Sequence, residues 1–175
     1  MKICELDERN SFILYSSKNM NMLVKEWLNA VGWNDNPFTF TISPNLLVGY
    51  KEQIDIAIRI LEEKHNLLLI IGPTGSGKTT FQKWLIHNLH NYDTIFVSKP
   101  PSKPAQIVDI FNEKYKGFFG INRIKNLYQM PEFLNKKLRK KRLVVFLDEA
   151  QESSIEVLEW LRVLSDQVDN MSVVL

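Results

Sequence analysis

One segment of the chain has the composition and spacing of a phosphate-binding loop. Gly72-Pro73-Thr74-Gly75-Ser76-Gly77-Lys78-Thr79 fits the pattern G-x-x-x-x-G-K-[ST] at every position. The glycines let the backbone curl so that successive N–H groups point at a phosphate, and a following helix adds the positive end of its dipole. Lys78 provides a point charge for the β- and γ-phosphates, and Thr79 provides a hydroxyl ligand for Mg²⁺. The N–H and hydroxyl of Thr80 are placed for the α-phosphate. The alternative, a glycine-rich turn that matches by accident, is disfavoured by the flanking segments.

A second segment, about 70 residues further on, ends an apolar run in two carboxylates. The run Leu143–Leu147 reads as a strand, so Asp148 and Glu149 would emerge at the carboxyl edge of a sheet, where open α/β folds bind ligands. We expect Asp148 to hold the Mg²⁺ shell and Glu149 to act as general base on the attacking water. An acidic turn after a strand is the simpler reading, but the phosphate loop upstream favours the catalytic one.

Both segments need strands and helices to position them. The apolar run Leu67–Ile71 predicts a buried strand before the loop, and the helix after it carries Phe81, Trp84, Leu85 and Leu89 on one face. Helical spacing also predicts helices from Lys51, from Pro104, from Pro131 and after Ser153 or Ser154. Further strands are expected at Thr94–Val97 and Leu143–Leu147, with another beginning at Val173. This alternation predicts an α/β fold of three layers, a parallel sheet flanked by helices.

Composition excludes several classes of protein. The chain has 175 residues, 45% of them hydrophobic and 24% charged, as in ordinary soluble domains. Its longest apolar runs have five residues, far short of the roughly twenty that a membrane span needs. The single cysteine excludes an internal disulfide framework and a cysteine zinc cage. With no signal segment at the N-terminus, the cytoplasm is the expected location.

The net charge of +2 is unevenly distributed. Residues 98–142 carry 12 basic and 3 acidic groups, and six of the basic groups lie within residues 136–142: Lys136, Lys137, Arg139, Lys140, Lys141 and Arg142. One interpretation is a surface that contacts the backbone of DNA or RNA. The other, which we favour from sequence, is a helix C-terminus and solvated loop, because aromatic residues are not interleaved with the charges.

The motifs together resemble those of the AAA+ ATPases. The resemblance rests on GPTGSGKTT, on the strand ending in LDEAQ, and on VGYKEQI about 25 residues before the phosphate loop. Two branches are most similar: the helper ATPases of DNA transposition and secretion, and the archaeal and eukaryotic replication initiators. The likeness covers residues 36–175, which we expect to form the nucleotide-binding core, with residues 1–35 as a short helical lead-in.

The resemblance implies roles for further residues. Val48 and Gly49 match the segment that lines the adenine pocket, where Tyr50 replaces an arginine frequent in the family. Gln151 would report the nucleotide state or be a surface side chain, and Arg162 would act on a neighbour's nucleotide or pair with Glu159 or Asp166. The phosphate-loop strand should neighbour the acidic strand through one intervening strand. Self-association is expected, and the family's sensors and helical lid would follow Leu175.

These observations predict a Mg²⁺-dependent ATPase that binds ATP on Gly72–Thr79. The sequence is compatible with three functions for such an ATPase. The first is a motor or switch acting on DNA, in replication initiation or transposition. The second is a remodelling, secretion or signalling ATPase without DNA binding, and the third is a nucleotide-gated adaptor that does not hydrolyse ATP. By itself, this length of chain is expected to hydrolyse ATP slowly.

Overall fold

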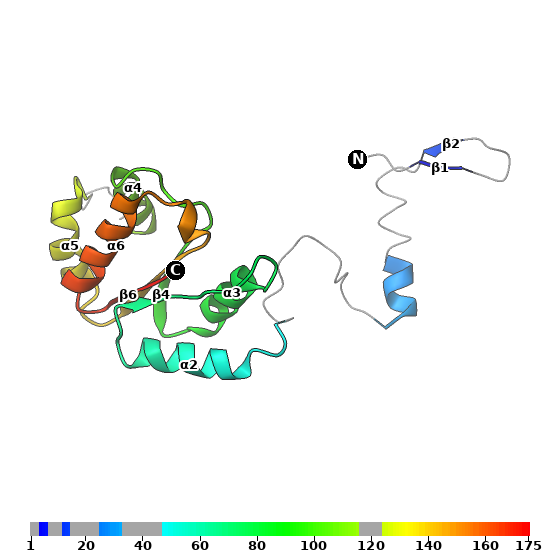
Figure 1. Ribbon diagram of the computed structural model, residues 1–175, viewed down its shortest axis with the longest axis horizontal. Coiled ribbons are helices and arrows are strands. Elements are labelled where there is room, and N and C mark those ends of the chain that lie inside the picture. Colours follow the sequence, from blue (N-terminus) through cyan, green and yellow to red (C-terminus); the bar gives the residue numbers. More distant parts are fainter. Residues whose placement is uncertain (1–3, 7–11, 15–24, 33–46, 116–123) are drawn as a thin grey trace. The chain divides into compact units, whose positions relative to one another are not determined.

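The computed structural model describes residues 4–6, 12–14, 25–32, 47–115 and 124–175 (Figure 1). The chain forms two units, residues Met1–Ile42 and Ser43–Leu175. In the first unit, β1 (Cys4–Leu6) pairs antiparallel with β2 (Phe12–Leu14), and residues 25–30 are helical. The predicted boundary between residues 35 and 36 lies outside the described residues.

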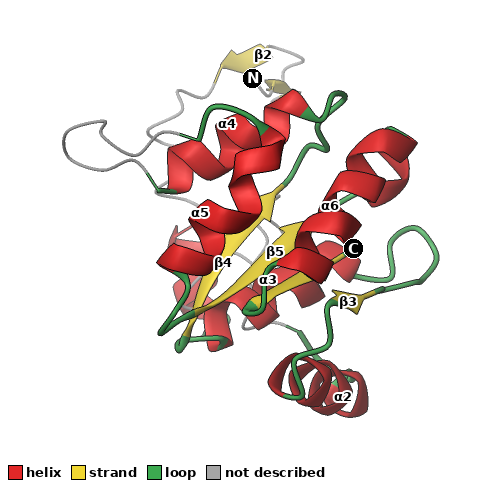
Figure 2. Cartoon of the chain, turned by 90° about the vertical axis from the view of Figure 1, so that its left-hand side faces the viewer, coloured by secondary structure: helices red, strands yellow, loops and turns green. Residues whose placement is uncertain are grey.

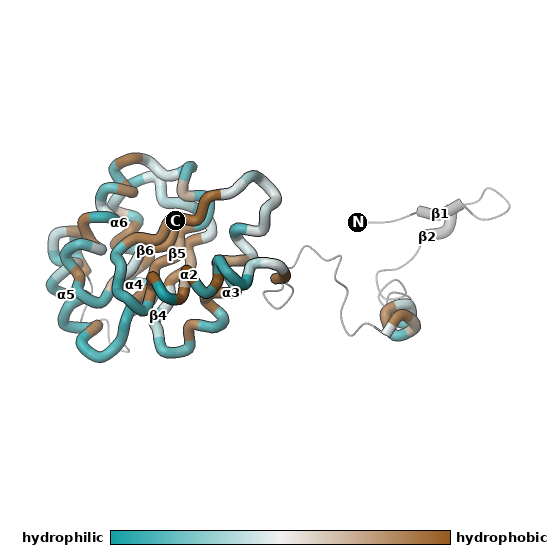
Figure 3. The backbone as a smooth tube through the Cα atoms, turned by 60° about the horizontal axis from the view of Figure 1, so that its bottom comes forward, coloured by the Kyte–Doolittle hydropathy of each residue, from teal (hydrophilic) through white to brown (hydrophobic). Residues whose placement is uncertain are grey.

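The second unit is built on a parallel sheet with the order β3-β6-β5-β4. Its strands are β3 (Leu67–Leu68), β4 (Tyr92–Val97), β5 (Arg142–Leu147) and β6 (Met171–Val174). β6 lies between the phosphate-loop strand and the acidic strand, so the strand order implied by the family resemblance is confirmed. The central strands β5 and β6 are buried along most of their length. Most of their residues are hydrophobic (Figure 3).

Helices cover both faces of this sheet (Figure 2). Side chains of β5 alternate: Val144 and Phe146 pack with α2 (Lys51–Glu62) and α3 (Lys78–Asn88), because neighbouring residues of a strand point to opposite faces. Leu143, Val145 and Leu147 pack on the other face with α4 (Ala105–Lys114), α5 (Met130–Lys137) and α6 (Ile155–Gln167). The predicted three-layer α/β architecture is therefore confirmed.

Local sequence explains where several helices begin. Ser154 caps α6, because its hydroxyl accepts a hydrogen bond from the N–H of Val157 at 3.4 Å. Pro104 precedes α4 with helical backbone angles, as predicted. Residues 127–129 form a short 3₁₀ helix, η2 (Leu127–Gln129), in which the Asn126 side chain accepts from the N–H of Gln129.

The strand before the phosphate loop differs from the prediction. We expected Leu67–Ile71 to be buried, but Leu67 is 46% exposed, Leu69 58% and Ile71 84%. Within the described sheet β3 pairs only with β6, and only the alternate residues Leu68 and Ile70 pack under α2 and α3. Ladder hydrogen bonds nevertheless continue past β3, from the N–H of Ile70 to Leu175 at 2.8 Å. β3 thus positions the phosphate loop at the edge of the sheet, although β3 itself is not buried.

Candidate nucleotide-binding site

The loop 72–77 turns from the end of β3 into the first turn of α3. Gly75 (φ 80°) and Gly77 (φ 84°) both have left-handed backbone angles, which an L side chain would strain. Gly77 is the residue immediately before α3, so the free N–H groups of the first helical turn open toward the space inside the loop. The local sequence therefore produces an anion-binding cradle at this helix N-terminus.

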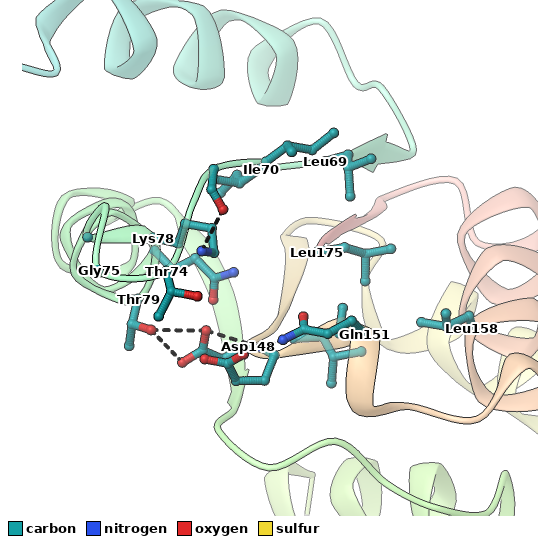
Figure 4. Close-up of a pocket in the computed structure, with 17 residues that line it drawn as sticks. Leu69, Ile70, Thr74, Gly75, Lys78, Thr79, Asp148, Gln151, Leu158 and Leu175 are labelled. Carbon is teal, nitrogen blue, oxygen red and sulfur yellow. Dashed lines mark hydrogen bonds between the residues drawn. The ribbon is translucent and has the colours of Figure 1, made fainter.

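Lys78 bends back over this cradle. Its ammonium donates a hydrogen bond to the carbonyl oxygen of Gly72 at 2.9 Å (Figure 4). It donates another to the carbonyl oxygen of Pro73 at 3.0 Å. An ammonium has three donors, so one N–H is left for a ligand. This position holds a positive charge at the mouth of the loop, which suits a phosphate group.

Thr79 and Asp148 meet at the carboxyl end of the sheet. The Thr79 hydroxyl lies 2.8 Å from Oδ2 and 3.1 Å from Oδ1 of Asp148 and donates to that carboxylate (Figure 4). Asp148 is 8% exposed, and its Oδ1 also accepts from the N–H of Glu149 at 3.1 Å. The two segments that sequence reasoning singled out, 69 positions apart, thus come into direct contact.

These two side chains have the donor chemistry that Mg²⁺ requires. Hydroxyl and carboxylate oxygens are hard ligands, and Mg²⁺ is usually held by one or two carboxylates together with waters and substrate phosphates. Adjacent ligands of an octahedral ion with bonds of about 2.1 Å lie about 3 Å apart, which the Thr79–Asp148 spacing matches. Among the described residues no group of three or more His, Cys, Asp or Glu could hold a metal by itself. Thr79 and Asp148 therefore fit Mg²⁺ bound together with a phosphate.

Glu149 projects from the same edge as an exposed side chain. Its backbone is left-handed (φ 51°, ψ 40°), which costs a non-glycine residue roughly 1–2 kcal/mol. The amide of Gln151 donates a hydrogen bond to its carboxylate. The strained turn and the amide together fix the direction of a carboxylate that can accept a proton.

A cavity of about 690 Å³ connects these groups. Lys78, Thr79, Asp148, Glu149 and Gln151 all line it (Figure 4). Of the predicted loop residues, Gly72, Thr74, Gly75 and Gly77 also line it, whereas Pro73, Ser76 and Thr80 do not. Val48 and Gly49 lie just before α2 and outside this cavity, and Val48 is 82% exposed. Their adenine-binding role stays a prediction.

Sequence reasoning missed two residues of the site. The hydroxyl of Tyr50 donates a hydrogen bond to the carbonyl oxygen of Ser76, and its ring meets Phe81 edge-on at 6.1 Å. Gln82, one turn into α3, is 2% exposed and lines the cavity. Tyr50 could have been found from sequence, because it stands where the family often has an arginine. No sequence motif marks Gln82.

The charged residues singled out elsewhere have local partners. Arg162 pairs with Asp166 at 3.2 Å, one of the two partners expected for it. In the basic segment 136–142, Lys136 pairs with Glu132 at 2.6 Å and Lys141 lies 3.5 Å from Asp93. Arg142 turns inward as the first residue of β5. Half of the basic segment is therefore engaged within the domain.

The arrangement can bind a nucleoside triphosphate and activate a water. A family model described as an AAA domain matches residues 61–175, more than half of the chain. None of the curated proteins matches the chain significantly. In the part of the chain that the structure describes, the helices are too short or too polar to cross a membrane.

Proposed function

The chain belongs to the AAA domain family of P-loop NTPases, and from this premise we propose that it binds ATP with Mg²⁺ and hydrolyses it. The observation that carries the proposal is the 2.8 Å contact between Thr79 and Asp148. It joins the phosphate loop to the acidic strand beside Lys78, which supplies the positive charge. Such an arrangement fits a triphosphate whose terminal oxygens share a metal ion with the protein.

In this proposal each residue has one task. The loop N–H groups and Lys78 bind the phosphates, and Thr79 with Asp148 holds the Mg²⁺. When bound, Mg²⁺ neutralises the charge that develops on the phosphate oxygens. Glu149, held by Gln151, accepts the proton of the attacking water. ATP is preferred over GTP on the family resemblance.

Two variants test binding and hydrolysis separately. Lys78→Ala should weaken ATP binding by more than tenfold, because the loop loses its only side-chain cation. Glu149→Gln should preserve ATP binding and lower turnover by about 10²- to 10³-fold, as expected for a lost general base. Calorimetry with an ATP analogue and a phosphate-release assay measure the two effects. Unchanged turnover in Glu149→Gln would remove that residue from the mechanism.

We further propose coupling to DNA as a second function, because part of the basic segment is unengaged. Lys137, Arg139 and Lys140 are exposed and have no ion pair within the described residues. They precede β5 at its amino end, whereas the nucleotide site lies at the carboxyl end of the same strand. DNA bound there would lie about 20 Å from the phosphates, judging from the six residues of β5.

The DNA proposal is tested by salt dependence. Replacing Lys137, Arg139 and Lys140 by Glu should reduce DNA affinity and flatten its slope against salt concentration. The exposed Lys51 and Lys64 on and after α2 serve as control positions. If ATP turnover does not respond to DNA and the triple variant binds DNA like the parent, the remodelling, secretion, signalling or adaptor roles are favoured instead. Self-association, as in other members of the family, is proposed on the resemblance.

A further inference from the structure

Gln82 is a buried amide without an identified partner at the floor of the nucleotide cavity. Its side chain is 2% exposed, and its Oε1 has no hydrogen-bond partner among the described residues. Buried polar groups are nearly always paired, because an unpaired one costs about 1–3 kcal/mol. An apolar residue would pack here at lower cost, so the amide needs a reason other than packing.

The position of Gln82 on α3 directs it toward the phosphates. It follows Lys78 by four residues and Thr79 by three, so all three share one face of the helix. Helical side chains lean toward the N-terminus of their helix, which here is the end that holds the phosphate loop. Gln82 also lines the same cavity as Asp148 and Glu149. Helix register and the cavity lining therefore put Gln82 on the same side of the site as Lys78, Thr79 and the two carboxylates.

The chemistry of Oε1 restricts its partner. A carbonyl oxygen accepts hydrogen bonds, and a nucleotide phosphate at neutral pH has almost no proton to donate. In the proposed function the spare N–H of Lys78 is used by a phosphate, so a water is the donor left for Oε1, and a water bridging protein and ligand needs two or more polar partners. Asp148 and Glu149 line the same cavity with or without a nucleotide, and the terminal phosphate of a triphosphate adds the partner that a diphosphate lacks.

We infer that Gln82 is a positioning residue that holds a water at the terminal phosphate and so makes the site prefer a triphosphate over a diphosphate. This inference rests on the proposed function. A diphosphate lacks the oxygens that fix the other side of this water, so the amide contributes little to its binding. The amide acts on the ligand through the water, whereas Glu149 takes the proton.

The test replaces the amide by an apolar side chain of the same length. Gln82→Met should leave the nucleotide-free protein equally or more thermostable, because a buried unpaired polar group is removed. With Mg²⁺ present, affinity for a non-hydrolysable ATP analogue should fall about five- to tenfold, while ADP affinity changes less than twofold. Turnover number should fall at least tenfold, and the KM for ATP should rise by about the same factor as the affinity falls, because KM follows the dissociation constant when turnover is slow. Gln53→Leu, an exposed glutamine on α2, is the control and should behave like the parent.

Different results have different meanings. If Gln82→Met and Gln82→Leu keep the parent's ratio of ATP-analogue to ADP affinity, the inference is overturned and the amide is a packing residue. If the parent chain binds neither nucleotide, the proposed function fails and the inference fails with it. Testing both variants guards against a folding defect specific to one side chain, since each is checked by its own unfolding curve.

Discussion

The amino and carboxyl ends of the parallel sheet differ in where their polar side chains find hydrogen-bond partners. At the amino end, Arg142 donates to the carbonyl oxygen of Leu61 and, at 2.9 Å, to the Ser172 hydroxyl. Ser172 in turn donates to the carbonyl oxygen of His65 at 2.6 Å, and the guanidinium lies 6.0 Å from the Tyr92 ring centre. In this group, which we call the Arg142 cluster, both terminal guanidinium nitrogens and the Ser172 hydroxyl donate inside the protein, whereas the Arg142 Nε is buried without a hydrogen-bond partner among the described residues.

At the carboxyl end, donors and acceptors keep spare capacity. Lys78 uses two of its three donors on its own loop, Gln82 has an unpaired oxygen, and Glu149 keeps free carboxylate lone pairs. A satisfied polar group stabilises the fold, whereas an unsatisfied one destabilises it unless a ligand completes it. The comparison teaches that the Arg142 cluster bonds mainly within the protein, whereas the groups at the carboxyl end keep capacity for a ligand.

The largest expected effect is at the carboxyl end. Asp148→Asn removes the charge that completes the metal pair with Thr79, so Mg²⁺-dependent ATP turnover should fall by at least 100-fold. Stability should stay within about 1 kcal/mol of the parent or rise, since the buried charge is lost and the amide oxygen can still accept from Thr79. Phosphate release and chemical denaturation measure the two quantities. The comparison would be contradicted if the loss of unfolding free energy exceeded the loss of activity expressed as an activation free energy.

The next effect belongs to the Arg142 cluster. Arg142→Ala leaves the Ser172 hydroxyl and the Leu61 carbonyl without this donor and should cost about 2–4 kcal/mol of unfolding free energy. Nucleotide affinity of the folded protein should be unchanged, because the cluster lies at the other end of β5. Arg139→Ala, an exposed neighbour, is the matched control and should cost less than about 0.5 kcal/mol. Equal losses in the two variants would contradict the proposed role of the cluster.

Sequence alone was enough to predict the fold class and the central pair of the site. The carboxyl ends of parallel strands meet at one edge, so a phosphate loop after one strand and an acidic pair after another had to converge. The apolar run Leu143–Leu147 was enough to predict the strand that precedes Asp148 and Glu149. These inferences depend on periodicity and strand polarity, both of which are local properties of the chain.

What the sequence did not predict depends on contacts between distant segments. The Tyr50 hydroxyl bonds to Ser76 across 26 positions, and no periodicity specifies such a bond. Burial of Gln82 follows from the packing of α3 on the sheet, whereas hydropathy alone favours exposure of a glutamine. β3 was predicted to be buried because its residues are apolar, but burial also needs a neighbour on each side. The intervening position of β6 came from family resemblance, since spacing does not determine strand order.

A smaller effect tests whether the phosphate loop relies on support from outside itself. Tyr50→Phe removes only the hydroxyl that donates to Ser76 and keeps the ring against Phe81. The loss of one such hydrogen bond should weaken ATP and ADP binding about equally, by roughly fivefold or about 1 kcal/mol. Calorimetry on both nucleotides measures it, with Tyr128→Phe on the exposed side of η2 as control. A change confined to ATP would instead place Tyr50 near the terminal phosphate.

At neutral pH the smallest effect is that of Tyr115, the residue after α4, whose contribution to stability depends on pH. Burial, and to a lesser extent the charge of Asp93, raises the pKa of Tyr115 to about 12 from its usual 10. The folded state therefore holds this proton more tightly than the unfolded chain. Its contribution to stability is complete below pH 10 and is lost as the pH rises from about 10 to about 12. Because the side chain is partly exposed, this loss should be below about 2 kcal/mol.

Tyr115→Phe isolates this contribution. The Tyr115 hydroxyl is buried without a hydrogen-bond partner in the described parts of the chain, so its removal should cost almost nothing at pH 7. The ring keeps its edge-on contact with Phe133 at 6.2 Å. Unfolding free energies measured at pH 7, 9 and 11 should be alike for parent and variant at the first two values and higher for the variant at the third. If the curves stay parallel at pH 11, the Tyr115 proton does not stabilise the fold.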